Sequence, residues 1–422
     1  MKGMEPQKAN PSKLSTTDFL FHALDGPRRP SDFALVFHLS EAPCVEALRA
    51  GARSARNLYP TTGSIISKGR WVRFEGSGDG VAAVSAAAEE AAAAAVEEFV
   101  GGPLDPRAET PVRQLLLTGR NGAGARLVTR FHHAAADGLS AAMWLGHQLH
   151  VAYGQEAPAA YASPFRELGL RRHPSPARRS RFAYPGRSDR LRAVGAKPSH
   201  TRRWLAVSAE ASDLRPRCRR AGGFTYNDLL ATCALETFSR WNRADRAGRR
   251  GKIGLWLPVD IRRESSEGFG NGTSRIRLYA RYDEDAPLAD KCREVRRQVS
   301  WSLRRGEWAV PEESALTSLP LWAASALLRG QLRRTRVDTS TGVFSHAERW
   351  AGQGGEVFRR VEKIECVGQL QERHCAAING VTHDGRTWLT FTYDPGLLPP
   401  DDARRLVGLY QEQLELARRE LP

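Results

Sequence analysis

Residues 126–140 read RLVTRFHHAAADGLS, and this stretch decides the fold. A strand pattern over 126–132 runs into the paired histidines His132 and His133, and a helix pattern begins near Gly138. Asp137 stands at the N-cap position of that helix, where its carboxylate can accept hydrogen bonds from the first helical amides. The histidines therefore lie on a tight connection between strand and helix, where a side chain can face a cleft.

Histidine suits proton transfer near neutral pH, because its ordinary pKa is close to the working pH. Neighbouring residues of an extended segment point in opposite directions, so only one of His132 and His133 can face a given site. The simpler interpretation is a pair of hydrogen-bonded histidines beside a capping aspartate. With Asp137 and Gly138 also in place, chance occurrence of the pattern falls to the order of one in a thousand. We therefore favour a catalytic site.

The sequence on both sides of this stretch mixes helix and strand patterns. The alanine-rich run 81–100, with paired glutamates, predicts a single helix. A turn is predicted at 119–122 between two strands. The fold class that follows is α+β. Helices are predicted at 43–58, 81–100, 227–241, 288–303 and 401–418, and strands at 111–117, 126–132, 253–259, 274–282, 374–381 and 387–393.

The length and a basic central segment indicate two halves. A chain of 422 residues exceeds one compact core. Residues 166–203 carry twelve Lys and Arg against two acids, and proline is frequent over 154–198, which predicts an exposed crossover. We divide the chain into a disordered tail (1–13), an N-terminal lobe (14–160), a basic Pro- and Arg-rich linker (161–203) and a C-terminal lobe (204–422).

The pattern HHxxxDG resembles the signature of the chloramphenicol-acetyltransferase-like superfamily. That group includes condensation domains of nonribosomal peptide synthetases, wax ester/diacylglycerol acyltransferases and polyketide-associated acyltransferases. The segments 258–262 (PVDIR) and 270–274 (GNGTS) resemble further parts of these proteins, and order and spacing agree over most of residues 15–415. The resemblance implies two similar lobes, each a mixed β-sheet with helices, and an active-site tunnel between them.

The resemblance also implies residue roles. His133 is expected to be the general base facing the tunnel, with His132 as a supporting residue. Asp137 is expected to turn away from the tunnel and pair with an arginine, for which Arg262 is the candidate. Gly138 is expected to let the backbone turn closely. Three matched residues are expected on the substrate-binding side of the site: Arg262, Asn271 and Ser274.

The implied reaction moves an acyl group from a thioester to a hydroxyl or amine of a small-molecule or lipid acceptor. No carrier segment with a phosphopantetheine serine is visible, so the donor is expected to be acyl-CoA or a separate acyl carrier protein. We expect no cofactor and no metal site. The alternative is a non-catalytic condensation-like protein that binds a partner through its basic face. The complete HHxxxDG pattern favours the acyltransferase, because a binding protein has no need of that base.

Charge and cysteine content limit the kinds of partner and the cellular compartment that we expect. The formal net charge is +16, but the arginines lack interleaved aromatic residues and no nucleic-acid-reading motif is present, so we expect no nucleic-acid partner. The six cysteines are scattered without a C-x-x-C pair, which indicates reduced thiols. With no secretory signal at the N-terminus, we expect a cytoplasmic monomer.

The run 319–329 (LPLWAASALLR) is apolar and is followed by three arginines before residue 337. Such a run is most often a helix packed on the protein core with a solvated end. It also fits a helix that rests on a membrane surface as a peripheral contact. The sequence leaves both interpretations open.

Overall fold

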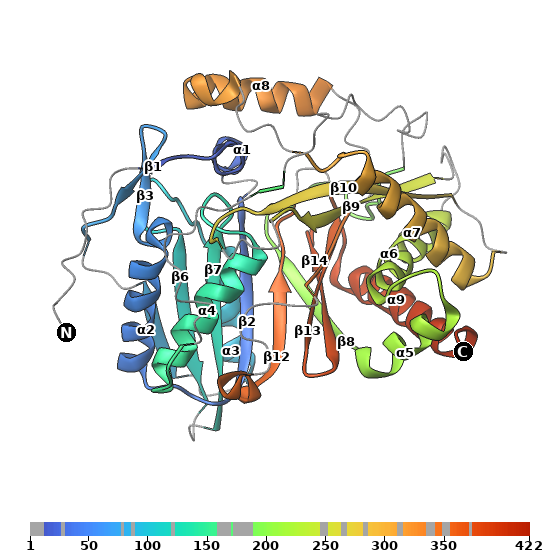
Figure 1. Cartoon of the computed structure of the whole chain (residues 1–422), viewed down its shortest axis with the longest axis horizontal. Coiled ribbons are helices and arrows are strands. Elements are labelled where there is room, and N and C mark those ends of the chain that lie inside the picture. Colours follow the sequence, from blue (N-terminus) through green and yellow to red (C-terminus); the bar gives the residue numbers. More distant parts are fainter. Residues whose placement is uncertain are drawn as a thin grey trace.

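Two lobes lie side by side, each built on a mixed β-sheet with helices packed against it (Figure 1). The predicted two-lobed α+β fold is confirmed. The computed structural model of the chain describes residues 12–26, 30–76, 80–85, 89–119, 123–157, 170–171, 189–244, 252–262, 268–281, 286–309, 315–334, 342–347, 355–370 and 374–422.

The N-terminal lobe contains a five-stranded sheet with the strand order β12-β2-β7-β6-β5. Alternate residues of its central strands point to opposite faces. One face packs on α2 (Val45–Leu58) and α4 (Gly138–Ala152), and the other packs on α3 (Glu89–Gly101). The strands are β2 (Asp32–Glu41), β5 (Val81–Ser85), β6 (Val112–Thr118), β7 (Ala123–His132) and β12 (Val361–Val367).

The C-terminal lobe contains a six-stranded sheet with the order β10-β9-β11-β13-β14-β8. Four helices share its hydrophobic core: α5 (Ala211–Ala221), α6 (Tyr226–Arg243), α7 (Leu288–Arg304) and α9 (Pro400–Glu420). Helix α6 begins at a capping box formed by Thr225 and Asp228. The strands are β8 (Arg203–Glu210), β9 (Lys252–Asp260), β10 (Thr273–Arg281), β11 (Gly342–Ala347), β13 (Ala376–His383) and β14 (Arg386–Tyr393).

A third, smaller group of elements covers one end of the molecule. Helix α1 (Thr16–Leu24) begins at a capping box formed by Ser15 and Asp18. It shares a hydrophobic cluster with α8 (Leu321–Arg334) and with a small sheet of order β1-β4-β3 (Ser12–Lys13, Arg70–Arg73 and Ser64–Ser67). Among the described helices, none is both long and apolar enough to cross a bilayer.

One predicted helix is wrong in its first part. Residues 81–85 form strand β5, which pairs in parallel with β6 at the edge of the sheet, and the helix α3 begins only at Glu89. The sheet edge offers backbone hydrogen bonds that outweigh the helix propensity of the alanines. The other predicted helices and strands are confirmed to within three residues at each end. The predicted turn at 119–122 falls mostly outside the described residues.

Two boundaries also differ from the prediction, at the N-terminal tail and at β12. Ser12 and Lys13 are not disordered, because they pair with β4, whereas 1–11 lie outside the described residues. Most of the linker 161–203 lies outside them too, and residues 193–203 of its described end are mostly exposed, as predicted, although Leu191 and Arg202 are buried. Strand β12, which the division at residue 204 assigns to the C-terminal lobe, pairs with β2 in the N-terminal sheet.

A buried cluster of charges joins the two halves of the chain at Asp32. Arg130 of β7 donates from Nε to the Asp32 carboxylate at 2.9 Å, and Arg202, just before β8, lies 2.9 Å from the other carboxylate oxygen. The two guanidinium groups also donate to the backbone carbonyls of Phe99 and Val100. All three charged side chains are buried. Each cation therefore depends on Asp32 for its charge balance.

Substitution Asp32→Asn is expected to destabilise the protein by roughly 3–5 kcal/mol, because it leaves two buried guanidinium groups without a counter-charge. Urea denaturation followed by circular dichroism measures the free energy of unfolding. The control is Arg404→Ala, which removes an exposed ion pair to Asp401 on α9 and should cost less than about 1 kcal/mol. Equal effects of the two substitutions would contradict the role of Asp32.

Candidate functional site

Strand β7 and helix α4 hold the HHxxxDG segment between them. The strand ends at His132 and the helix begins at Gly138. Asp137 is the N-cap, and its carboxylate accepts a hydrogen bond from the backbone N–H of Ser140 at 3.0 Å. The predicted capping role is confirmed. Five residues of connection therefore leave the paired histidines with little conformational freedom.

The imidazole of His133 lies against two phenylalanine rings. Phe21 of α1 stacks on it with ring centroids 4.6 Å apart, and Phe33 of β2 packs at 4.5 Å. Its backbone is held on both sides, because its N–H donates to the carbonyl of Ser31 at 2.7 Å and its carbonyl accepts from Asn271 at 2.7 Å. The ring is thus held by packing and the backbone by hydrogen bonds.

Burial lowers the pKa of His133 to about 4, and the neighbouring His132 contributes in the same direction. The charges of Asp137 and Asp32 oppose this shift only in part. Near pH 7 the ring is therefore neutral and can accept a proton. Its Nδ1 is buried without a hydrogen bond of ordinary geometry.

His132 lies on another side of the connection and is fully buried. Its Nδ1 accepts a hydrogen bond from the backbone N–H of Ala134 at 3.1 Å, so the ring proton belongs on Nε2. That nitrogen lies 3.5 Å from the carboxylate of Asp25, at the end of α1. These contacts suit the supporting role expected of His132, because they hold the turn that carries His133.

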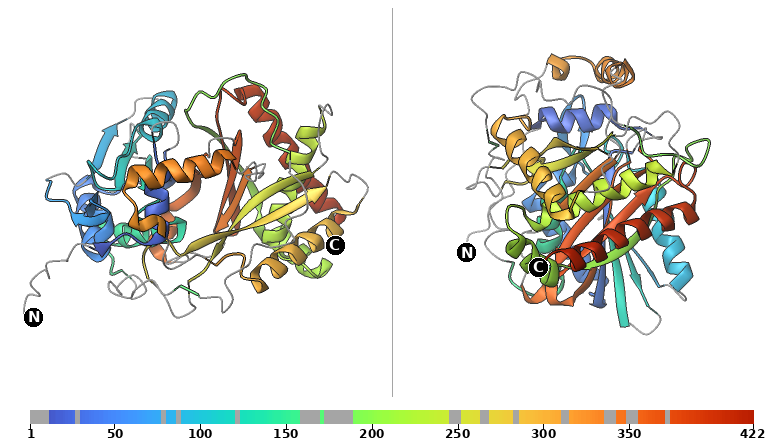
Figure 2. Two further views of the ribbon diagram at one scale, coloured as in Figure 1. Left: turned by 90° about the horizontal axis from the view of Figure 1, so that it is seen from above. Right: turned by 90° about the vertical axis from the view of Figure 1, so that its right-hand side faces the viewer.

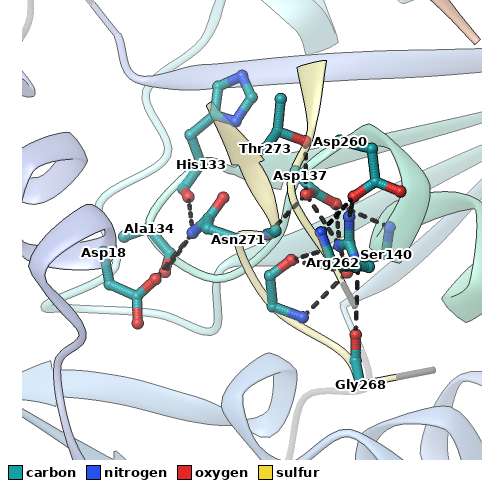
Figure 3. A network of polar contacts seen from close by, with 12 residues as sticks. Asp18, His133, Ala134, Asp137, Ser140, Asp260, Arg262, Gly268, Asn271 and Thr273 are labelled. Atoms are coloured by element: carbon teal, nitrogen blue, oxygen red, sulfur yellow. Dashed lines mark hydrogen bonds and ion pairs between the residues drawn. The ribbon is translucent and has the colours of Figure 1, made fainter. Parts of the chain in front are cut away.

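Asp137 forms a buried ion pair with Arg262, as the resemblance implied. Nη2 of Arg262 donates to the two carboxylate oxygens at 2.8 and 2.9 Å. Gly272 and Thr273 donate to the same carboxylate at 2.9 and 2.7 Å (Figure 3). Burial raises the pKa of Asp137, but Arg262 and the hydrogen bonds outweigh it and hold the pKa below its ordinary value. The carboxylate is charged and cannot serve as a proton donor near neutral pH.

Arg262 is engaged by other protein groups as well. Its guanidinium contacts Asp260 at 3.1 Å, and it donates to the Ser140 hydroxyl and the Gly270 carbonyl, each at 3.0 Å. Ser140 also bonds both the N–H and the carbonyl of Gly270. These bonds join the start of α4 to the connection between β9 and β10. They favour a positioning role for Arg262, and its direct contact with substrate stays a prediction.

Asn271 links three parts of the chain. Its side-chain amide donates to the carbonyl of His133 and to the carboxylate of Asp18 in α1, at 2.7 and 2.8 Å. Asn271 is therefore a clamp on the backbone of the base, and Figure 3 shows the His133 ring pointing away from it. Ser274 lies half-buried on β10 opposite Val259. Substrate binding by Asn271 and Ser274 stays a prediction.

The close turn expected of Gly138 stays a prediction, because the packing of the described residues does not require a glycine there. A Cβ atom at this position would meet no atom within 4 Å, and the residue does not adopt a left-handed backbone. The glycine that the packing does require is Gly272, where a Cβ would lie 2.5–2.6 Å from the Arg262 side chain. The sequence carries no signal for this, because both residues lie in the irregular connection between β9 and β10, where no periodic pattern places one side chain against another.

Five residues around the site were not predicted from the sequence: Asp18, Phe21, Asp25, Phe33 and Ser140. Ser140 belongs to the stretch 126–140, and its place in the first turn of α4 could have indicated that it lies near Asp137. The four others come from α1, from the residue after it and from β2. They carry no motif, and only tertiary packing brings them to His133.

The overall fold resembles that of solved structures. The chain aligns over 98% of its length with 97% of TRI3 trichothecene 15-O-acetyltransferase from Fusarium sporotrichioides, with a TM-score of 0.70 and 11% identity. It aligns over 99% with 98% of the first condensation domain of the calcium-dependent antibiotic synthetase, with a TM-score of 0.70 and 14% identity. The chain has the condensation-domain fold. No family model and no curated protein matches its sequence.

The condensation-domain fold does not by itself name a reaction. The starter condensation domain of rhizomide synthetase, solved in complex with C8-CoA, aligns over 98% of this chain with a TM-score of 0.66 and 13% identity. An epimerization domain of tyrocidine synthetase B aligns over 99% with a TM-score of 0.63 and 11% identity. Function has to be argued from the residues of the site.

Substitution Gly272→Ala is expected to destabilise the protein by roughly 1–3 kcal/mol, because the added methyl group displaces the Arg262 side chain from its ion pair with Asp137. Urea denaturation measures the effect. The matched control is Gly408→Ala in α9, where a Cβ meets nothing within 4 Å and which should be neutral or stabilising by up to about 1 kcal/mol. An unchanged free energy of unfolding in Gly272→Ala would show that the Arg262 side chain can move without weakening its ion pair with Asp137.

Proposed function

We propose that this protein is an acyltransferase that moves an acyl group from a thioester to a hydroxyl or amine, with His133 as the general base. One observation supports this most: the ring of His133, the second histidine of HHxxxDG, is packed against two aromatic rings and is neutral near pH 7. Hydrogen bonds from Ser31 and Asn271, one in each lobe, hold its backbone. A neutral imidazole with a low pKa is ready to take a proton but binds it only weakly. General-base assistance of this kind contributes about 10²–10⁴ in rate.

In the proposed step, Nε2 of His133 takes the proton from the acceptor as its oxygen or nitrogen attacks the thioester carbonyl carbon. The tetrahedral oxyanion then collapses, the carbon–sulfur bond breaks, and the leaving thiolate takes the proton back from the imidazolium. The enzyme forms no covalent intermediate. Positioning the two substrates beside His133 contributes as much as the base or more.

The donor is proposed to be acyl-CoA or an acyl carrier protein. Support for the first comes from a neighbour of this fold that was solved with C8-CoA, and support for the second comes from the synthetase domains of the same fold. Asp137 and Arg262 are assigned to positioning, because their charges are satisfied by each other and by the surrounding backbone.

Thiol release from a panel of acyl-CoA thioesters, with and without pooled alcohols and amines, tests the function. Wild type is expected to show acceptor-dependent release, and His133→Ala is expected to lose it by about 10²-fold or more. The matched control is His200→Asn, which removes an exposed imidazole at a left-handed position that asparagine tolerates. Undiminished release by His133→Ala would refute the assignment.

Absence of release with acyl-CoA would direct the assay to acyl carrier protein donors. Absence with both donors would favour the alternative, a non-catalytic protein of the same fold. Far-UV circular dichroism of each variant ensures that a loss of activity is not a loss of folding.

The pH dependence gives a second prediction. A base whose pKa is lowered to about 4 stays unprotonated well below pH 6.5, so kcat/KM should hold as the pH falls and decline only near pH 4. Initial rates of thiol release from pH 4 to 8, with circular dichroism at each pH, measure this. A decline centred near pH 6.5 would indicate that His133 is solvated in the free enzyme.

A further inference from the structure

Helix α8 presents a large apolar surface to the outside. Trp322 is 76% exposed and Leu327 is 56% exposed, and Leu319, just before the helix, is 37% exposed. The other exposed large hydrophobic residues of the described chain are dispersed over three other segments: Val84, Val194 and Leu303. A concentration of this kind in one short segment marks an interaction surface.

Over residues 321–330, the outward arc of α8 between Trp322 and Leu327 carries small and apolar residues only. With about 3.6 residues per turn, Trp322 and Leu327 mark the two borders of this arc, and smaller residues fill the space between them. Those smaller residues are Ala323, Ala326 and Gly330. A Cβ at Gly330 would meet nothing within 4 Å. A surface helix packed on one side ordinarily carries charged residues on the other, so the outward face of α8 departs from the usual pattern over residues 321–330.

The inward half of α8 is already occupied. Ala324 is fully buried, and Leu321 and Leu328 pack with it against α1. Ser325 donates to the carbonyl of Ala23 at 2.7 Å, and Arg329 donates to the carbonyl of Asp25 at 2.9 Å. Figure 2 shows α8 lying over α1 at the border of the molecule. The helix is therefore anchored by one face and leaves the other available.

The positive charge around α8 indicates which kind of partner its outward face would bind. Residues 315–337 contain four arginines (329, 333, 334 and 336) and no aspartate or glutamate, in a chain of net charge +16. A second copy of the chain would bring the same positive charge to the contact, which disfavours self-association. An anionic lipid surface complements both properties, because tryptophan and leucine enter the headgroup boundary and arginine pairs with phosphate.

We propose that α8 docks this protein on the surface of an anionic membrane, with Trp322 and Leu327 inserted at the headgroup level. The docking does not depend on acyl transfer. It does place lipid near the site, because α1, on which α8 rests, carries Phe21 against His133. A lipid acceptor or donor would then reach the protein from the side where α1 and α8 lie.

Flotation of the full chain with vesicles of phosphatidylcholine and phosphatidylglycerol tests the docking. Wild type is expected to float with these vesicles, to bind pure phosphatidylcholine more weakly, and to dissociate in high salt. The double variant Trp322→Ser with Leu327→Ser should bind on the order of tenfold more weakly. The matched control is Leu303→Ser, an exposed leucine of α7, which should bind like wild type.

Three results would overturn the docking. The first is failure of wild type to float with anionic vesicles. The second is equal flotation of wild type and the double variant, which would assign binding to charge alone. Sedimentation of the wild type as a dimer that the double variant abolishes would instead assign this face to a second copy of the chain. Thermal melts of the variants check that these exposed substitutions leave the fold intact.

Discussion

The buried ion pair between Asp137 and Arg262 is the contact on which the arrangement of the site depends. It joins the start of α4 in the N-terminal lobe to the second residue after β9 in the C-terminal lobe. Asp137 also caps α4, so one carboxylate serves a helix end, an ion pair and the backbone N–H of Gly272. Loss of either partner would leave a buried charge, a far larger cost than that of losing a surface ion pair.

The base is separated from this charge network although it is only four residues away. His133 lies among aromatic rings, whereas Asp137 lies among donors. Two opposite environments on one short connection keep the histidine neutral and the aspartate ionised. Asn271 connects the two environments. Its side chain donates to the carbonyl of His133, and the next two residues, Gly272 and Thr273, donate to the carboxylate of Asp137. A displacement of this loop would therefore reach the base through its backbone.

The fold places the site but leaves the chemistry open. Proteins described as acetyltransferase, condensation and epimerization domains share it with this chain at 11–14% identity. The acyltransferase proposal therefore rests on His133 and its surroundings. The outward face of α8 is separate from this site, because its residues belong neither to the HHxxxDG segment nor to the contacts between the two lobes.

The sequence by itself determined the parts that depend on local order. The HHxxxDG segment, the capping position of Asp137 and most helices and strands follow from residues close together in the chain, because hydrogen bonding and periodicity act over a few residues. The pairing of Asp137 with Arg262 followed from the family resemblance. Only the tertiary structure decided that β5 is a strand, that β12 joins the N-terminal sheet, and that Phe21, Phe33 and Asp18 surround the base. These contacts join residues far apart in the chain, and packing between such residues leaves no periodic signal in the sequence.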